Sequence, residues 1–510
     1  MSSIPTLNSC TFYHGSIDTR ECRELLPNVG DFLIRNKALD QGPTGTTTSA
    51  ILTVAITPDQ ASMTGKQIPS DYSLKQECTT RLKSYAINGP FGTYSVQGTT
   101  ETFPTIEGVC AGFVQSKKAL PGGGVLQKSV DRKPWQLLLS DIEFPNPEVA
   151  LGKGSYGKVI KAKLLRKDAQ PIDVAVKETN EGSNETTFSE VYNEARAMRR
   201  LQHQHIIRLE GVVVEKLPIL LVIEFFEGTC LLKHLQSKKV DGPMRLAVVC
   251  GIMYGLAYIH SQNYIHRDIA ARNVMVSADC RRIKIIDFGL AKHGTTFNMA
   301  VPQKIPTKWL APEVIKMLTF STKSDVWAFG VTVWEVFHDG AEPYSNMVNV
   351  KMKSSVAKKK GKEADDALKI TENMDFVPKE LEDLLSKIFE KNSRMRPEMT
   401  EVVTEMDAVI DVFKKSEKAT DKTVYDNIRL LQEQRSKATG PPTSSNASNT
   451  TNSGLDKNAV KPKEPKSPQP PSKGTKNLKT VTRRNRGKKP VSKDEKNTGK
   501  VTTTRRKTKP

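Results

Sequence analysis

Residues 266–273 read HRDIAARN, and residues 287–289 read DFG. Before them, residues 151–159 read LGKGSYGKV and residues 174–177 read VAVK, and after them residues 311–313 read APE. Each motif alone is a weak signal, and the glycine-rich stretch also fits an ordinary turn. Five motifs in this order, each in a stretch with the matching strand, turn or helix pattern, do not arise by coincidence.

Together the five motifs resemble those of the protein kinase family. The resemblance implies an α+β domain with a β-rich amino lobe and a helical carboxy lobe over residues 143–413, with ATP and Mg²⁺ as cofactors. Within the carboxy lobe it predicts a structural ion pair between Arg396 and Glu313. The charged, weakly periodic residues 351–366 are expected to form a surface loop.

The resemblance also assigns roles to single residues. Lys177 would hold the α and β phosphates of ATP, oriented by Glu194, although the two could equally form an ordinary surface ion pair. Asp268 would accept the proton of the substrate hydroxyl, and Asn273 and Asp287 would bind Mg²⁺. The implied catalytic set is Asp268, Lys177, Glu194, Arg272 and Asn273. The implied nucleotide-binding set is Leu151, Gly152, Lys153, Gly154, Ser155, Tyr156, Gly157, Lys158, Val159, Ala175 and Lys177.

Two stretches indicate tyrosine as the acceptor residue. Serine/threonine kinases usually have a lysine two residues after the catalytic aspartate, whereas this chain has Ala270 there and Arg272 two residues later. Residues 304–313 read KIPTKWLAPE, which also resembles tyrosine kinases. Pro306 in this stretch would support the longer, flatter ring of a tyrosine.

Near the amino terminus, residues 12–35 read FYHGSIDTRECRELLPNVGDFLIR and resemble the start of an SH2 domain. Arg35 matches the position whose guanidinium binds the phosphate of phosphotyrosine in that family, and its alternative is an exposed strand-end arginine. Residues 44–49 would either add hydroxyls and amides to such a site or form a loop without a ligand. Three positions depart from the family pattern, which predicts weak or altered binding: Thr19, Lys37 and Ser84.

An SH2 domain followed by a tyrosine kinase resembles the Fes/Fer group of nonreceptor tyrosine kinases. The chain starts too close to the SH2 domain for the F-BAR region that the group usually carries, so we expect a short form. The expected parts are the SH2 domain at 12–115, a linker at 116–142, the kinase domain at 143–413, a helical extension at 414–435 and a disordered basic tail at 436–510. The expected partners of this monomeric protein are tyrosine-containing protein substrates and tyrosine-phosphorylated proteins.

Charge separates the tail from the rest of the chain. The net charge is +21, from 77 Lys and Arg against 56 Asp and Glu, and residues 436–510 contribute +16 of it. Overall basicity is therefore no sign that the folded part binds nucleic acid. The basic run at 483–489 fits a nuclear signal, a contact to nucleic acid or to an anionic membrane surface, or simply a solvated tail.

Composition favours the cytoplasm. No apolar run approaches the roughly 18 residues of a membrane span, and residues 1–10 lack the pattern of a signal peptide. The seven cysteines are odd in number and never form a CxxC pair, as is typical of reduced thiols. Peripheral binding at the inner membrane surface and a nuclear location stay open.

The activation segment lacks a residue that the Fes/Fer pattern contains. Phe297 stands where that pattern has a tyrosine, and no tyrosine lies between Asp287 and Glu313. We therefore expect activity that is independent of loop tyrosine phosphorylation, or that depends on Thr295 or Thr296 instead. The rival hypothesis is a signalling scaffold with a kinase fold that no longer turns over, and the intact catalytic set argues against it.

Overall fold

The computed structural model describes residues 7, 9–36, 50–57, 81–89, 92–154, 157–167, 169–178, 185–215, 218–237, 240, 242–299, 305–358, 368 and 379–415. Several sequence predictions lie outside these residues, namely those for Lys37, residues 44–49, Ser155, Tyr156, the helical extension beyond residue 415 and the basic tail at 436–510. Residues 1–442 form one compact unit, described below, and residues 443–510 belong to a second unit.

The amino-terminal domain is a five-stranded sheet with two helices. Strands rich in β-branched and aromatic residues form the sheet in the order β4-β3-β2-β1-β5. The strands are β1 (Asp31–Asn36), β2 (Ala50–Ile56), β3 (Arg81–Asn88), β4 (Ser95–Val96) and β5 (Lys128–Ser129), and the helices are α1 (Thr19–Leu25) and α2 (Ile106–Ser116). Because β5 pairs with β1 and Leu120 and Leu126 lie in this domain's core, part of the expected linker at 116–142 belongs to the domain.

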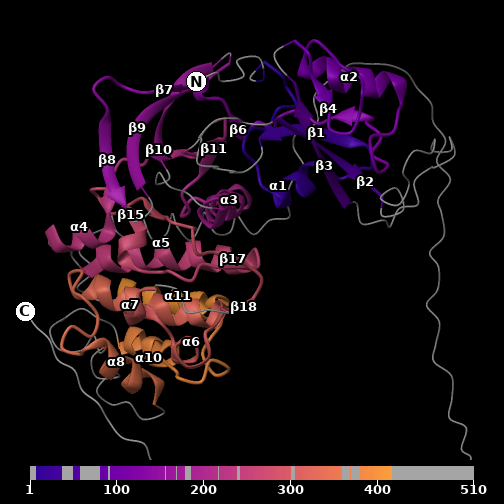
Figure 1. Ribbon diagram of the computed structural model, residues 1–510. Helices are drawn as coiled ribbons and strands as arrows, with labels where there is room; N and C mark the ends of the chain where they lie inside the picture. The colour runs from indigo at the N-terminus through magenta and orange to yellow at the C-terminus, as the bar shows by residue number, and fades with distance from the viewer. Residues whose placement is uncertain are drawn as a thin grey trace, which may run out of the picture. The chain divides into compact units, whose positions relative to one another are not determined.

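The amino lobe of the second domain is β-rich. Its sheet has the order β6-β11-β12-β10-β9-β7, with β8 paired to β9 (Figure 1). These strands are β6 (Gln136–Leu137), β7 (Ile142–Glu143), β8 (Val149–Gly154), β9 (Gly157–Arg166), β10 (Ala169–Glu178), β11 (Leu209–Val213) and β12 (Leu220–Glu224). The lobe also contains helix α3 (Glu185–Arg200). The predicted strand VAVK is the end of β10, paired on both sides, with Val174 and Val176 fully buried.

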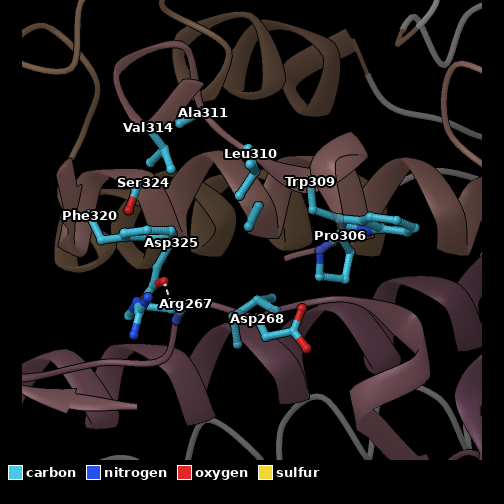
Figure 2. A pocket seen from close by; sticks show the side chains of 12 residues that line it. Arg267, Asp268, Pro306, Trp309, Leu310, Ala311, Val314, Phe320, Ser324 and Asp325 are labelled. Carbon is cyan, nitrogen blue, oxygen red and sulfur yellow. Dashed lines mark hydrogen bonds between the residues drawn. The ribbon is translucent and has the colours of Figure 1, made fainter. Parts of the chain in front are cut away.

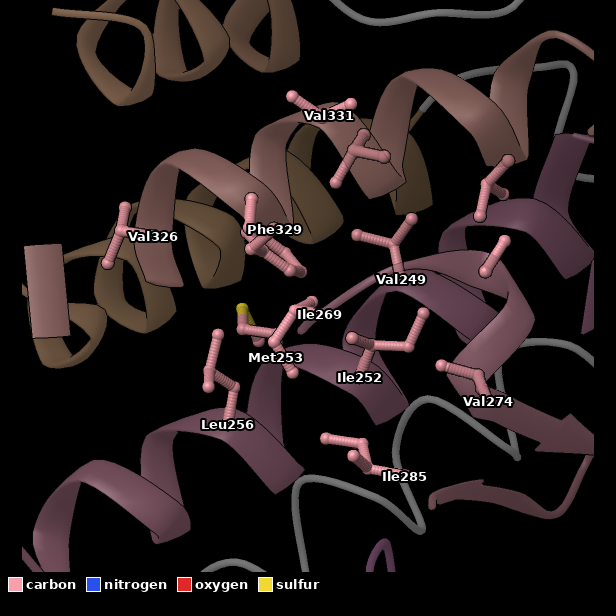
Figure 3. Packing of buried hydrophobic residues seen from close by; sticks show 14 of the residues in the cluster. Val249, Ile252, Met253, Leu256, Ile269, Val274, Ile285, Val326, Phe329 and Val331 are labelled. Atoms are coloured by element: carbon pink, nitrogen blue, oxygen red, sulfur yellow. The ribbon is translucent and has the colours of Figure 1, made fainter. Parts of the chain in front are cut away.

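The carboxy lobe is helical. Its helices are α4 (Leu231–Ser237), α5 (Gly242–Ser261), α6 (Pro312–Met317), α7 (Thr322–Phe337), α8 (Asn349–Ala357), α10 (Lys379–Ile388) and α11 (Met399–Lys415). Figure 3 shows the apolar faces of α5 and α7 packed together, with Met253 beside Phe329. The expectation of a loop at 351–366 is wrong for its first part, because α8 buries Met352 and Val356.

Short strands and turns complete the two lobes. They are β13 (Thr229–Cys230), β14 (Tyr264–Ile265), β15 (Val274–Val276), β16 (Ile283–Ile285), β17 (Lys292–His293), β18 (Thr296–Asn298) and β19 (Thr319–Ser321), with short 3₁₀ turns at Leu139–Asp141, Ala271–Asn273 and Thr307–Trp309. The HRDIAARN motif fills the connection between β14 and β15, and DFG follows β16. The fold therefore brings both motifs to one side of the carboxy lobe.

Among the described residues, one helix is long and apolar enough to cross a membrane. It is Met244–Ser261 within α5, and 72% of that stretch is buried inside the protein. Val248, Val249 and Ile252 from this stretch lie in the carboxy-lobe core, so we assign it as a core helix. The six described cysteines form no disulfide with one another.

A hydrophobic cluster joins the amino-terminal domain to the amino lobe. It combines Leu26 and Leu33 of the first domain with Tyr192, Val212 and Leu221 of the second. The hydroxyl of Tyr192 donates to the carbonyl of Ser16 at 2.6 Å. Two arginines of α3 also meet acidic residues of α1, since Arg196 and Arg199 both pair with buried Glu21. Helix α3 is thus held from the side of the amino-terminal domain.

Candidate active site

The end of β10 presents Lys177 to helix α3. The Nζ of Lys177 donates to both carboxylate oxygens of Glu194, at 2.7 and 3.0 Å, and both side chains are largely buried. Burial lowers the pKa of Lys177, but the carboxylates of Glu194 and Asp287 outweigh that effect and leave it raised. The pairing predicted from the sequence is present, and it keeps a charged ammonium beside Asp287.

The connection after β14 fixes the carboxylate of Asp268 with two donors. Arg272 pairs with Oδ1, and the Nδ2 of Asn273 donates to Oδ2 at 2.7 Å and to the main-chain carbonyl of Asp268 at 2.8 Å. The guanidinium of Arg272 also lies over the ring of Trp309, 4.3 Å from its centroid. These contacts set the direction of the Asp268 carboxylate.

Asp325, near the start of α7, holds the main chain of the HRD motif. Its carboxylate accepts from the backbone N–H of His266 at 2.7 Å and of Arg267 at 2.9 Å. Arg267 has a φ of +72°, an uncommon conformation for an arginine, which these two bonds stabilise. The buried carboxylate of Asp325 therefore fixes the main chain that leads into Asp268.

Asp287 lies next to Asn273. The main-chain N–H of Ile286 donates to the carbonyl of Asn273 at 2.9 Å, and Asp287, with a φ of +66°, accepts from Gly289 at 3.2 Å. The amide nitrogen of Asn273 donates to Asp268, so the amide oxygen of Asn273 is the atom that could bind a metal. One carboxylate and one amide oxygen suit Mg²⁺, which takes its other ligands from phosphates and water. The described residues contain no cluster of three or more His, Cys, Asp or Glu side chains that could hold a metal.

The glycine-rich stretch forms the β8–β9 hairpin. Gly152 pairs with Val159, Lys153 with Lys158 and Gly154 with Gly157, and the tip residues between them lie outside the described part of the chain. Gly157 has a φ of +137°, which other residues rarely adopt. A Cβ built on Gly152 meets no described atom within 4 Å, so packing does not require a glycine there. A bare backbone facing open space suits close approach of phosphates.

A pocket opens beside Asp268, as Figure 2 shows. Pro306 and Trp309 lie across from the Asp268 side chain, and Arg267, Phe320 and Asp325 line the other end (Figure 2). The pocket therefore combines the carboxylate of Asp268 with an apolar wall. A flat apolar ring that carries a hydroxyl is the side chain that such a surface complements.

Sequence reasoning missed Glu335 behind this pocket. Its Oε2 accepts from the indole nitrogen of Trp309 at 2.9 Å and from the backbone N–H of Ala271 at 3.0 Å. Burial raises the pKa of Glu335 to about 7, against the effect of those two donors and of Arg272. An acidic residue inside the apolar run of α7 was the available signal, because a buried carboxylate needs specific partners.

Arg35 lies on strand β1 in the sheet of the amino-terminal domain. Its Nε donates to the hydroxyl of Thr53 at 3.1 Å, its Nη1 donates to the carbonyl of Ile17 at 3.3 Å, and the hydroxyls of Thr53 and Ser84 are 3.0 Å apart. Ser84, which departs from the SH2 pattern, is thus linked to Arg35 through Thr53. The sequence could not show this link because the three residues lie on separate strands.

Away from the reacting groups, Arg396 binds Glu313 through two nitrogens at 2.7 and 3.1 Å, and both side chains are buried. This confirms the structural ion pair predicted from the sequence. It anchors the APE motif to the segment before α11.

The model of the protein tyrosine and serine/threonine kinase family matches residues 147–406. These residues cover the β8–β9 hairpin, the Lys177–Glu194 pair, the HRD and DFG motifs and the beginning of α11. The match therefore contains every catalytic and metal-binding position expected from the sequence.

Relatives that match part of the chain include proteins named as tyrosine kinases. The chain is 29% identical over 352 residues to Fer-related kinase 1 of Caenorhabditis elegans. The alignment covers 69% of this chain and 83% of that protein. It is 29% identical over 405 residues to the tyrosine-protein kinase transforming protein Fps of Avian sarcoma virus (strain PRCII), covering 78% and 67%. It is 37% identical over 228 residues to the tyrosine-protein kinase TXK of Mus musculus, covering 44% and 41%.

Proposed function

Because the chain belongs to the family of protein tyrosine and serine/threonine kinases, we propose that it transfers the γ-phosphate of ATP to tyrosine hydroxyls of protein substrates. The observation that carries this proposal is the Asp268 carboxylate, fixed by Arg272 and Asn273 and facing the Pro306–Trp309 wall. The tyrosine kinase relatives support the choice of acceptor.

Nucleotide binding would use the amino lobe. Lys177 would bind the α and β phosphates with its ammonium, kept charged and in place by Glu194. The β8–β9 hairpin, residues 151–159, would cover the phosphates with main-chain N–H groups, and Ala175 would leave room for the base. Asn273 and Asp287 would hold Mg²⁺, which when bound neutralises charge on the phosphate oxygens.

At the acceptor, Asp268 would take the proton of the tyrosine hydroxyl as the oxygen attacks the γ-phosphorus. A loose transition state needs little base strength, so a carboxylate that aims the hydroxyl is sufficient. Arg272 would add a positive charge close to the phosphoryl group and, stacked on Trp309, would order the wall that receives the substrate ring.

For the amino-terminal domain we propose an SH2 domain that binds phosphotyrosine through Arg35. Two features support this assignment. In the sequence, strands β1 to β4 of the sheet lie between helices α1 and α2. Arg35 on β1 also donates to the hydroxyl of Thr53 on β2. The alignment with the viral Fps protein spans more residues than the stretch from 147 to the carboxy terminus, so it includes part of this domain. Tyrosine-phosphorylated proteins would be its partners.

The remaining proposals concern the setting of the enzyme. We propose a monomeric nonreceptor kinase of the Fes/Fer type that acts in the cytoplasm. The basic tail at 436–510 would add weak contact to an anionic membrane surface or to nucleic acid, and it would need a second contact such as the SH2 domain to localise the protein firmly.

The test is a transfer assay on a random Glu/Tyr polymer with Mg²⁺ and ATP. Wild type should phosphorylate tyrosine, and Lys177→Met and Asp268→Asn should each lower the rate by at least about a hundredfold while leaving the melting temperature within a few degrees. No transfer by wild type despite measured ATP binding would favour the alternative, an SH2-containing scaffold with a weak or inactive kinase fold.

A further inference from the structure

The arginine of the HRD motif lies between two phenylalanine rings. The guanidinium carbon of Arg267 is 4.5 Å from the ring centroid of Phe297 and 4.4 Å from that of Phe320. Phe297 belongs to β18 in the activation segment, and Phe320 belongs to β19 just before α7. The two strands are paired, and Phe297 lies opposite Phe320 in their register. We call Phe297 and Phe320 the aromatic clamp.

The clamp surrounds a cation that has few other partners. Arg267 is only 5% exposed, and among the described residues no carboxylate forms an ion pair with its guanidinium. It donates from Nη1 to the carbonyl of Leu290 at 3.0 Å and contacts the sulfur of Met299 at 3.7 Å, while its Nε has no partner in the described part of the chain. Two ring faces therefore add to the attraction that the nearby carboxylates of Asp325 and Asp268 exert on this buried charge.

These contacts connect four parts of the active site. Arg267 precedes Asp268 in the chain, Leu290 follows the DFG motif, Phe297 lies in the activation segment, and Phe320 adjoins α7. Phe297 also has the Nζ of Lys292 at 5.6 Å from its ring centroid. The two rings restrain the guanidinium of Arg267. Because Asp268 is the next residue in the chain, the clamp also restrains the backbone of Asp268.

We propose that Phe297 is a positioning residue of the transfer reaction: its ring, together with Phe320, holds Arg267 and thereby Asp268 in place, so that the activation segment needs no phosphate. This inference rests on the proposed phosphotransfer. A phosphate on a loop residue would attract Arg267 by charge. Here the neutral ring of Phe297 contacts the same guanidinium.

The test compares variants of the full chain treated with phosphatase and checked by mass spectrometry for loop phosphate. Phe297→Leu keeps an apolar side chain but removes the ring, and it should lower kcat about tenfold with little change in KM for ATP. Phe297→Tyr restores the ring and should stay within about twofold of wild type. In an Arg267→Met background, which has already lost the cation, Phe297→Leu should have no further effect on kcat, because both act through one contact.

Hydrogen exchange gives a readout that does not depend on turnover. Amides of residues 292–299 and 264–268 should exchange faster in Phe297→Leu than in wild type and Phe297→Tyr. If wild type transfers no phosphate, the proposed function fails, and exchange still decides whether the clamp orders these segments. Equal kcat and equal exchange for Phe297→Leu and wild type would overturn the inference, as would wild-type activity that disappears when Thr295 or Thr296 is dephosphorylated.

Discussion

Glu335 is a carboxyl group inside an otherwise apolar helix, and its protonation should govern part of the pH dependence of stability. Burial raises its pKa to about 7 from an ordinary value of 4.5, and the facing charges are Arg272 and Asp268. A raised pKa means that the folded state binds a proton the unfolded state has lost. The stabilising contribution is therefore complete below about pH 4.5 and is lost as the pH rises through 7.

Glu335→Gln should remove this dependence. Both observed hydrogen bonds end on one oxygen, Oε2, so the amide oxygen of a glutamine can accept both from Trp309 and Ala271. Between pH 4.5 and 8 the free energy of unfolding of wild type should fall by about 3 kcal/mol relative to the variant. Urea unfolding at several pH values measures this difference, and parallel curves for the two proteins would contradict it.

Arg35 should be irreplaceable by lysine if it binds phosphotyrosine. Lysine keeps the charge but cannot form paired hydrogen bonds from a planar group, and it loses the Nε contact with Thr53. Arg35→Lys should weaken binding of a phosphotyrosine peptide at least about tenfold in calorimetry. Thr53→Val, which leaves the guanidinium in place, should weaken it less, and equal binding by Arg35→Lys and wild type would refute the assignment of the site.

At the scale of elements, helix α3 depends on a buried acid from another domain. Glu21 of α1 is 1% exposed and pairs with Arg196 and Arg199 of α3, whereas Glu24, one turn further on, is 29% exposed and pairs with the same two arginines. Glu21→Gln should lower the free energy of unfolding by about 3 kcal/mol, because it removes the most deeply buried carboxylate that pairs with Arg196 and Arg199. Glu24→Gln is the matched control and should cost under about 1 kcal/mol, since water screens that pair.

Denaturant midpoints of the two variants check this prediction. A loss in Glu21→Gln no greater than in Glu24→Gln would show that Asp18, which also pairs with Arg196, carries the interaction instead. Transfer activity should fall in Glu21→Gln as well, because α3 positions Glu194 and through it Lys177.

The local sequence pattern predicted the elements that carry the kinase motifs. It did not predict elements and pairings that depend on contacts between distant parts of the chain. The strand that carries Lys177 follows from the alternating pattern of residues 174–177. Residues 351–357 look charged and irregular, yet α8 buries Met352 and Val356, two apolar residues one turn apart. The pairings of Glu21 with Arg196 and of Phe297 with Arg267 join distant parts of the chain, and no local signal marks them.

For the molecule as a whole, the cluster shared by the two domains predicts cooperative unfolding. Leu26 and Leu33 from the amino-terminal domain pack with Tyr192, Val212 and Leu221 from the kinase domain, so neither side keeps its apolar surface covered alone. Calorimetry of the full chain should therefore show one main transition for the described domains. A ligand of either domain should stabilise both, because it binds only the folded state.

Mg²⁺ and ATP at about a hundred times their dissociation constant should stabilise that single transition by about 2.7 kcal/mol, although the nucleotide contacts only the kinase domain. The variant Glu21→Gln/Tyr192→Phe removes the buried carboxylate and the hydroxyl that donates to Ser16, while both domain cores stay intact. Because the variant keeps the apolar cluster, its transition should stay single and shift to a lower temperature, and the nucleotide should still raise it. Two separate transitions already in wild type, only one of them sensitive to nucleotide, would show that the cluster does not couple the domains.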